Sequence, residues 1–136
     1  VIKGKLDSQD ECMVGIKGAL VFTAPSEGFE NMPYTILEAM AHAKPIVVSD
    51  TGGLTEFVEH RQTGLVHKTG CSRGLAEALL TLLSDDQLRK DLSMNAYQAC
   101  RRQYAIEMTT SATLSFYRDV VQMQGGRAIH MDDIAP

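Results

Sequence analysis

Two acidic residues, Glu30 and Glu38, lie eight residues apart around the start of a predicted helix. Glu30 falls in the turn before this helix, and Glu38 falls inside it. Pro33 suits the first helical position, which leaves the amides of Tyr34 and Thr35 without partners inside the helix. The helix dipole adds about half a positive charge at the same end, so an anion such as a phosphate is expected there.

The two glutamates conflict with a bound phosphate, because like charges repel by roughly 1 kcal/mol at 4 Å in water and roughly 4 kcal/mol at an effective dielectric near 20. They should therefore bind groups beside a diphosphate. Sugar hydroxyls suit them, since a hydrogen bond to a carboxylate contributes about 1.5–3 kcal/mol. Glu38 lies roughly 8 Å along the helix axis at about 1.5 Å per residue, so the pair can reach separate sugar rings. This pattern favours a nucleotide sugar, whose phosphates need cations from elsewhere because residues 25–43 contain no Lys or Arg.

Simpler roles are open for the same residues. Thr35 and Glu38 fit the S/T-x-x-E capping box, which would make Glu38 structural. In the simpler interpretation Asn31 or Thr35 merely caps the helix and binds no ligand. Glu30 can be a solvated turn residue, and Glu56 can be a surface residue in the first turn of a short helix. The glycines of two loops can contact a ligand or merely supply positive φ in turns. They are Gly28, Gly52 and Gly53.

The chain has 136 residues, 44% of them hydrophobic and 22% charged, which predicts one globular domain. Its 17 acidic and 13 basic residues give a formal charge of −4, which argues against nonspecific binding to nucleic acid or an anionic membrane. A small-molecule partner is therefore expected. No apolar run approaches the roughly 20 residues of a membrane span. The first residue is Val1 rather than Met, so we expect a fragment of a longer protein.

The cysteines and histidines indicate neither disulfides nor a metal site. Cys12, Cys71 and Cys100 are odd in number and form no C-x-x-C pair, which favours a reducing, cytoplasmic location. The histidines lack metal-like spacing, and an ordinary solvated or capping role is expected for each. They are His42, His60, His67 and His130. We expect no metal and no cofactor.

Apolar runs and turn signals predict alternating strands and helices. Strands are expected at 1–3, 19–24, 45–49 and 64–67, and helices after the cap at 7–8 and at 34–43 and 54–58. Three helices should follow Ser72, with a disordered tail at 123–136. Continuous apolar strands between helices are typical of a parallel sheet covered on both faces, so the predicted class is α/β, with a Rossmann-like sheet followed by C-terminal helices. Ligands of such sheets bind beyond the carboxyl ends of the strands, where the loops 25–32 and 50–53 should meet.

Several short motifs occur in a specific order along the chain. They are Pro25-Ser26, Glu30-x(7)-Glu38-Ala39-Met40-Ala41, Lys44-Pro45-Ile-Val-Val-Ser-Asp50, Gly52-Gly53, Glu56 and Thr63-Gly64-Leu65-Val66. Together they resemble glycosyltransferase family 4, the retaining enzymes of the GT-B fold, over about residues 1–121. The resemblance implies a retaining hexosyltransferase of which residues 1–122 are the N-terminally truncated donor-binding domain. Such an enzyme transfers a sugar from a nucleoside diphosphate sugar, such as a UDP- or GDP-sugar, to a glycan, lipid or small-molecule acceptor.

The resemblance also implies roles for individual residues. Glu30 resembles the catalytic-site glutamate that contacts hydroxyls of the donor sugar, and Glu38 resembles the glutamate that binds the ribose. Tyr34 and Thr35 match positions whose amides meet the diphosphate, and the family usually needs no metal. The implied donor-binding set is Glu30, Asn31, Met32, Pro33, Tyr34, Thr35 and Glu38, with Gly28, Gly52 and Gly53 as candidate loop contacts.

The chain departs from the family pattern in three respects. Ala43 replaces a typical Gly and would cost about 1 kcal/mol in a left-handed conformation. Pro33 and Tyr34 replace the commoner Gly and aliphatic pair. The Arg and Lys that hold the diphosphate, and the N-terminal domain that binds the acceptor and carries any membrane association, are missing, so this chain alone should not catalyse transfer. A noncatalytic nucleotide-sugar-binding module is the alternative. A dinucleotide enzyme is disfavoured because no G-x-G-x-x-G follows a strand, and a purely structural role would predict no nucleotide binding.

Overall fold

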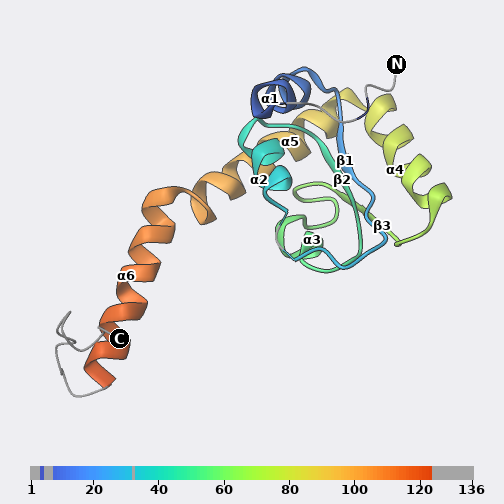
Figure 1. The fold of residues 1–136 in the computed structure, drawn as a ribbon. Coiled ribbons are helices and arrows are strands. Elements are labelled where there is room, and N and C mark those ends of the chain that lie inside the picture. The colour runs from blue at the N-terminus through green and yellow to red at the C-terminus, as the bar shows by residue number, and fades with distance from the viewer. Residues whose placement is uncertain (1–3, 5–7, 32, 124–136) are drawn as a thin grey trace. The chain divides into compact units, whose positions relative to one another are not determined.

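The computed structural model describes residues 4, 8–31 and 33–123 and divides the chain into two units, Val1–Arg102 and Gln103–Pro136. The predictions for a strand at 1–3, for Met32 and for a tail beyond residue 123 therefore lie outside the described residues. The first unit contains the sheet and most of the helices (Figure 1). In the second unit the structure describes one long helix, α6 (Ile106–Met123), none of whose residues is buried.

Strands and helices alternate along most of the first unit. They are α1 (Gln9–Gly18), β1 (Phe22–Ala24), α2 (Tyr34–Ala41), β2 (Ile46–Ser49), α3 (Leu54–Phe57), β3 (Leu65–His67), α4 (Ser72–Ser84) and α5 (Asp86–Gln103). Ser8 caps α1 as predicted, because its hydroxyl accepts a hydrogen bond from the Glu11 amide at 3.2 Å. The predicted succession of elements from residue 8 to α6 is confirmed.

The three described strands form a parallel sheet in the order β1-β2-β3, with β2 in the centre. Thr23 of β1 lies opposite Val47 of β2, and Val48 lies opposite Val66 of β3. Every residue of β2 is buried, which explains the apolar run Ile46 to Val48; the buried hydroxyl of Ser49 finds backbone acceptors. A strand with both faces buried requires cover on each side, and the helices supply it.

Helices cover both faces of the sheet, as predicted (Figure 1). On one face α4 contacts β2 and β3, and the core there combines residues of the sheet with residues of α4 and α5. These core residues are Val47, Leu65, Leu82 and Leu92. On the other face α2 and α3 contact β2 through buried apolar side chains. Each fully buried Leu or Ile contributes about 1.5–3 kcal/mol to folding. Both layers therefore stabilise the sheet from which the loops at its edge extend.

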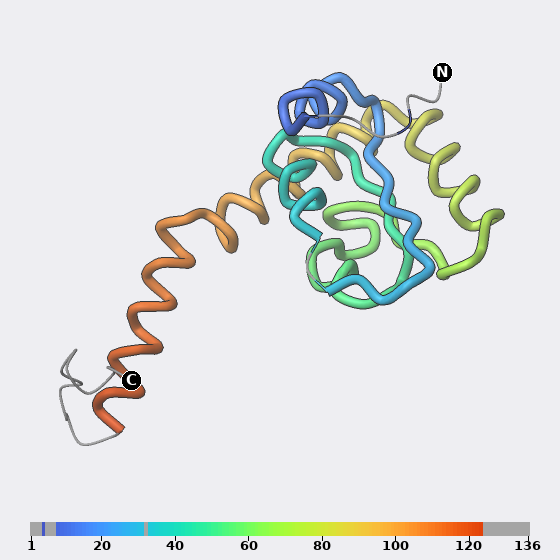
Figure 2. The backbone as a smooth tube through the Cα atoms, in the orientation of Figure 1, coloured from blue at the N-terminus to red at the C-terminus, as the bar shows by residue number. Residues whose placement is uncertain are grey.

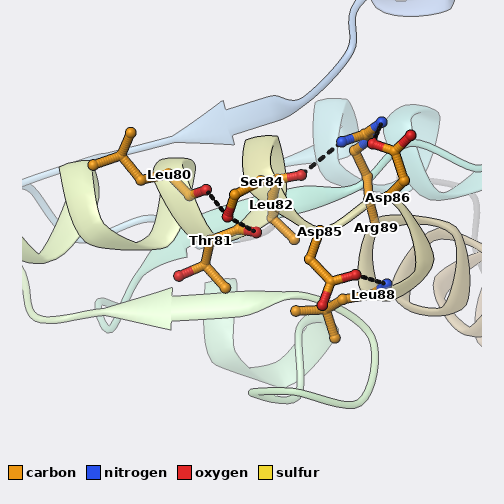
Figure 3. A network of polar contacts seen from close by, with 8 residues as sticks. All are labelled: Leu80, Thr81, Leu82, Ser84, Asp85, Asp86, Leu88 and Arg89. Carbon is orange, nitrogen blue, oxygen red and sulfur yellow. Dashed lines mark hydrogen bonds and ion pairs between the residues drawn. The ribbon is translucent and has the colours of Figure 1, made fainter.

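Polar contacts fix the junction between α4 and α5 (Figure 3). The Asp85 carboxylate accepts a hydrogen bond from the Leu88 amide at 2.9 Å and so caps the first turn of α5. The Arg89 guanidinium donates to the Leu82 carbonyl at 2.7 Å and pairs with Asp86 at 2.6 Å. The end of α4 is thereby tied to the start of α5.

Two predicted boundaries were wrong at the chain segments that flank β1 and α2. The strand predicted at 19–24 begins only at Phe22, because Ala19 still caps α1 and donates its amide to the Ile16 carbonyl at 3.2 Å. Pro33 is not the first helical residue. It is the N-cap of α2, with φ −75° and an extended ψ of 104°.

The helix predicted at 34–43 ends at Ala41, because Ala43 adopts a left-handed conformation with φ 50°. The amide of Ala43 donates to the Met40 carbonyl at 3.0 Å, and the amide of Lys44 donates to the Ala39 carbonyl at 2.9 Å. These two bonds form a Schellman motif, which usually has Gly at the left-handed position. The conformational cost considered for Ala43 therefore applies.

Candidate functional site

The loop that follows β1 is held in place by side chains at the end of β2. Ser49, the buried last residue of β2, donates its hydroxyl to the Ser26 carbonyl at 2.6 Å. Thr51 donates its hydroxyl to the Gly28 carbonyl at 3.3 Å. The loops after β1 and β2 therefore meet at the carboxyl edge of the sheet, as predicted for a parallel sheet. Figure 2 traces this path of the backbone.

Two glycines allow the second loop to approach the first one closely. A Cβ on Gly52 would overlap the Glu30 carbonyl oxygen and lie 2.7 Å from the Glu30 nitrogen, and a Cβ on Gly53 would overlap the Asn31 carbonyl oxygen. The Gly53 amide also donates to the Glu30 carbonyl at 2.6 Å. Gly52 has a left-handed φ of 52°, whereas Gly53 has φ −71° and Gly28 is not left-handed. Positive φ thus explains Gly52 only, and close backbone approach explains Gly52 and Gly53.

Glu30 is a fixed carboxylate in this arrangement. Its side chain is half-buried, and Oε1 accepts a hydrogen bond from the Ser26 hydroxyl at 2.7 Å. Its backbone is held at the same time by Gly53. Neither ion pair among the described residues involves Glu30. The carboxylate therefore keeps a second oxygen for an external hydrogen-bond donor, and Glu30 is not the freely solvated turn residue considered above.

The N-terminus of α2 follows directly after this carboxylate. No side chain caps the helix, and its first turn contains no acidic residue. The Ile36 amide donates to the Pro33 carbonyl at 3.0 Å, while the amides of Tyr34 and Thr35 precede the first possible intrahelical bond. Thr35 lies inside the helix rather than at its N-cap, so the capping-box alternative is wrong. Asn31 provides no cap either.

Glu38 lies in the middle of α2 with a half-buried side chain. Its carbonyl accepts hydrogen bonds from the His42 amide at 3.1 Å and from His42 Nδ1 at 2.8 Å, which places His42 at the C-terminal end of α2. Its carboxylate has no partner within the described ranges. Since the capping role is excluded, the described contacts show no structural role for the Glu38 carboxylate.

The sequence reasoning missed a contact that joins the loops after β2 and β3. The Asp50 carboxylate accepts hydrogen bonds from the Thr69 amide at 2.6 Å and from the Thr69 hydroxyl at 2.7 Å. These bonds, the side-chain one foremost, hold the pKa of Asp50 below its ordinary value. A signal was available, because an Asp directly after one buried strand and a Thr just after the next are expected at the same edge of a parallel sheet.

His67 at the end of β3 was expected to be solvated or capping, but its side chain is buried. Its Nδ1 donates to the Lys68 carbonyl at 3.0 Å, and Nε2 is buried without a hydrogen-bond partner in the described structure. His67 borders a cavity of about 250 Å³ with Pro25, Glu27 and the start of α4. Within the described residues no three His, Cys, Asp or Glu side chains cluster as metal ligands would.

The family model of the glycosyl transferases group 1 matches residues 2–99. The chain belongs to this family. A curated relative, the N,N'-diacetylbacillosaminyl-diphospho-undecaprenol alpha-1,3-N-acetylgalactosaminyltransferase of Campylobacter jejuni, is 38% identical over 104 residues, which are 75% of this chain and 27% of the relative. The chain spans about a third or less of the curated relatives that it matches, such as 30%, 27% and 32% of three of them.

Solved structures agree with this assignment. The sucrose-phosphate synthase of Thermosynechococcus elongatus superposes with a TM-score of 0.74 at 26% identity, over 81% of this chain and 27% of that one. Anabaena Alr3699/HepE, solved in complex with UDP-glucose, superposes with a TM-score of 0.67 at 28% identity, over 74% of this chain and 28% of that one. The fold of this group 1 chain is that of the C-terminal domain of GT-B glycosyltransferases.

The structure brings most of the predicted donor-binding set to one edge of the sheet of this glycosyltransferase domain. Glu30 and the α2 N-terminus follow β1, with Gly52 and Gly53 packed against the backbone of Glu30 and Asn31. Asn31 and the side chains of Tyr34 and Thr35 are exposed, whereas Met32 lies outside the described residues. Their contacts with a donor remain predictions. No helix in the described part of the chain is long and apolar enough to cross a membrane.

Proposed function

We propose that this chain is the donor-binding part of a retaining glycosyltransferase of family 4. The observation that carries the proposal is the uncapped N-terminus of α2, which lies between the carboxylates of Glu30 before it and Glu38 within it. Neither carboxylate has a cationic partner in the described part of the chain. The free amides of the first turn favour the diphosphate of the donor. The carboxylates then accept hydrogen bonds from hydroxyls on either side, Glu30 from the transferred sugar and Glu38 from the ribose.

Two comparisons support the nucleotide-sugar part of the proposal. The C. jejuni relative is named as a transferase of N-acetylgalactosamine, and Alr3699/HepE was solved with UDP-glucose. We extend donor binding to this chain because both align with three quarters of it. The acceptor-binding site would belong to parts of the enzyme outside this chain. The same holds for the cations that complete the diphosphate site.

Within a retaining reaction, the described residues would bind and orient rather than transfer protons. The α2 N-terminus would stabilise negative charge that develops on the leaving diphosphate, and no metal is needed for that role. Glu30 would orient the sugar ring through its hydroxyls, while Ser26 and Gly53 hold Glu30 in position. Because the chain spans only about a third or less of its curated relatives, the isolated chain should bind donors weakly and transfer no sugar.

Titration of the isolated chain with UDP-glucose and GDP-mannose, followed by NMR, tests the donor site. Glu38→Ala should weaken binding of the preferred donor about tenfold or more, since a hydrogen bond to a charged group contributes about 1.5–3 kcal/mol. Glu77→Ala is a matched control, because Glu77 is an exposed helical glutamate on α4 whose ion pair with Arg73 contributes little. Unchanged affinity in Glu38→Ala with an intact fold would contradict the ribose assignment.

A full-length homologue that contains this domain tests the reaction class. The anomeric configuration of the product, read by NMR, should match that of the donor sugar. Inversion would contradict the retaining mechanism. A full-length protein that binds donors but transfers no sugar to any acceptor would instead support the noncatalytic module.

A further inference from the structure

The fixed charge in the loops after β1 and β2 is negative, whereas the loop after β3 begins with Lys68, whose charge acts on Asp50. The loops after β1 and β2 and the start of α3 carry Glu27, Glu30, Asp50 and Glu56. Lys44 is the only Lys or Arg between residues 25 and 60. Its ammonium group donates to the Lys17 carbonyl in the last turn of α1 and to the carbonyl of the C-cap Ala19 at 3.2 Å. Lys44 follows the C-terminal end of α2, so it is remote from the N-terminus where the donor would lie.

Glu30 differs from the other acids in this group because it cannot easily move away. Ser26 holds one carboxylate oxygen at 2.7 Å, and Gly53 holds the Glu30 backbone at 2.6 Å. The side chain is half-buried, whereas Glu27 and Glu56 are exposed. Asp50 is charged but engaged by Thr69. Glu30 is therefore an uncompensated charge with a fixed position, next to the proposed diphosphate site.

We propose that Glu30 makes the donor site selective by charge, so that it accepts neutral and amino sugars and rejects sugars that carry a carboxylate. This inference rests on the proposed function. A sugar hydroxyl or ammonium group donates to the free oxygen of Glu30, whereas a uronate presents a second negative charge. Two such charges about 8 Å apart at an effective dielectric near 20 weaken binding about thirtyfold, which corresponds to about 2 kcal/mol.

The test compares donors that share the base and the diphosphate and differ in the sugar. NMR titration of the isolated chain with UDP-glucose, UDP-glucuronic acid and UDP-glucosamine, at low salt, should give the tightest Kd for the amino sugar and a Kd about thirtyfold weaker for the uronate than for glucose. GDP-mannose and GDP-mannuronic acid form a parallel pair in case the chain prefers guanine. Added salt should shrink the ratio, because screening weakens interactions between exposed charges.

Glu30→Gln keeps the size and the hydrogen-bonding oxygen of the side chain but removes the charge. It should reduce the uronate-to-glucose ratio of Kd to about threefold or less, while Glu77→Gln on α4 should leave the ratio unchanged. If Glu30→Gln does not fold, Ser26→Ala provides a second route, since it frees the carboxylate to turn away and should also lower the ratio.

The outcomes separate this inference from the donor site itself. Equal Kd values for the neutral and uronate donors, or a ratio that salt and Glu30→Gln do not change, would overturn charge selection and leave the proposed function standing. No binding in either nucleotide series would overturn both.

Discussion

Substitution of Gly52 by Ala tests whether the loop after β2 fixes the conformation of the loop after β1, which contains Glu30 and is called the donor loop below. Gly52 has φ 52°, and a left-handed conformation costs a non-glycine residue about 1–2 kcal/mol. The new Cβ would also overlap the Glu30 carbonyl oxygen and lie 2.7 Å from the Glu30 nitrogen. Both atoms belong to the backbone, so the loop must shift, at a cost typical of overpacking, about 1–3 kcal/mol. The expected loss of stability is about 2–5 kcal/mol.

Gly70→Ala is a matched control for this change. Gly70 is also left-handed, with φ 71°, but nothing lies within 4 Å of its added Cβ. Urea unfolding should therefore show a loss of only about 1–2 kcal/mol for Gly70→Ala. Under folding conditions, Gly52→Ala should also weaken binding of the preferred nucleotide sugar, and Gly70→Ala should not. Equal losses of stability together with equal donor affinities would refute the idea that Gly52 serves the approach of the two loops.

Three further predictions concern other parts of the first unit. Ala43→Gly should raise the free energy of unfolding by up to about 1 kcal/mol in urea titrations, because the left-handed position no longer strains a Cβ; a lower stability would contradict the Schellman assignment. Hydrogen bonds from Thr69 lower the pKa of Asp50, so their stabilisation is complete above the ordinary pKa of 3.8 and is lost as the pH falls through the lower folded value. As the pH falls through that range, urea titrations should show a smaller decrease in the free energy of unfolding for Asp50→Asn than for the wild type. Identical pH profiles of the two proteins would exclude a stabilising role of the ionised Asp50. Burial raises the pKa of the Cys100 thiol, whereas Cys12 is exposed, so mass spectrometry should show faster alkylation of Cys12 at mildly alkaline pH. Faster labelling of Cys100 would contradict its burial.

The sequence predicted the fold well where one physical signal dominated. The apolar run at 45–49 predicted a buried strand, and β2 is buried throughout. Boundaries failed where two signals competed. Ala19 and Leu20 extend the apolar run of β1, yet Ala19 caps the preceding helix. Pro33 fits either the N-cap or the first helical position by composition, and only its extended ψ decides between them.

The candidate site was predictable in its residues but not in its supports. Spacing placed Glu30 and Glu38 around a helix N-terminus, and the structure keeps them there. Ser26 of the same loop holds the Glu30 carboxylate, but the other supports are distant in sequence: Ser49 holds the start of the loop, and Gly53 holds the Glu30 backbone. Such contacts depend on the register between β1 and β2, which pairs Ala24 with Val48. Sequence spacing within one loop contains no information about that register.

The same supports explain why the donor loop should respond to mutations that touch no ligand. The described residues of the loop after β1 have few polar contacts of their own, and the carbonyls of Ser26, Gly28 and Glu30 all accept hydrogen bonds from residues 49–53. The loop after β2 is in turn tied to the loop after β3 through Asp50 and Thr69. A change in the second loop therefore moves Glu30 and the start of α2 together. Donor affinity and sugar selectivity should then decline together. Removal of the Glu30 charge alone should instead change mainly the ratio of Kd between uronate and neutral donors.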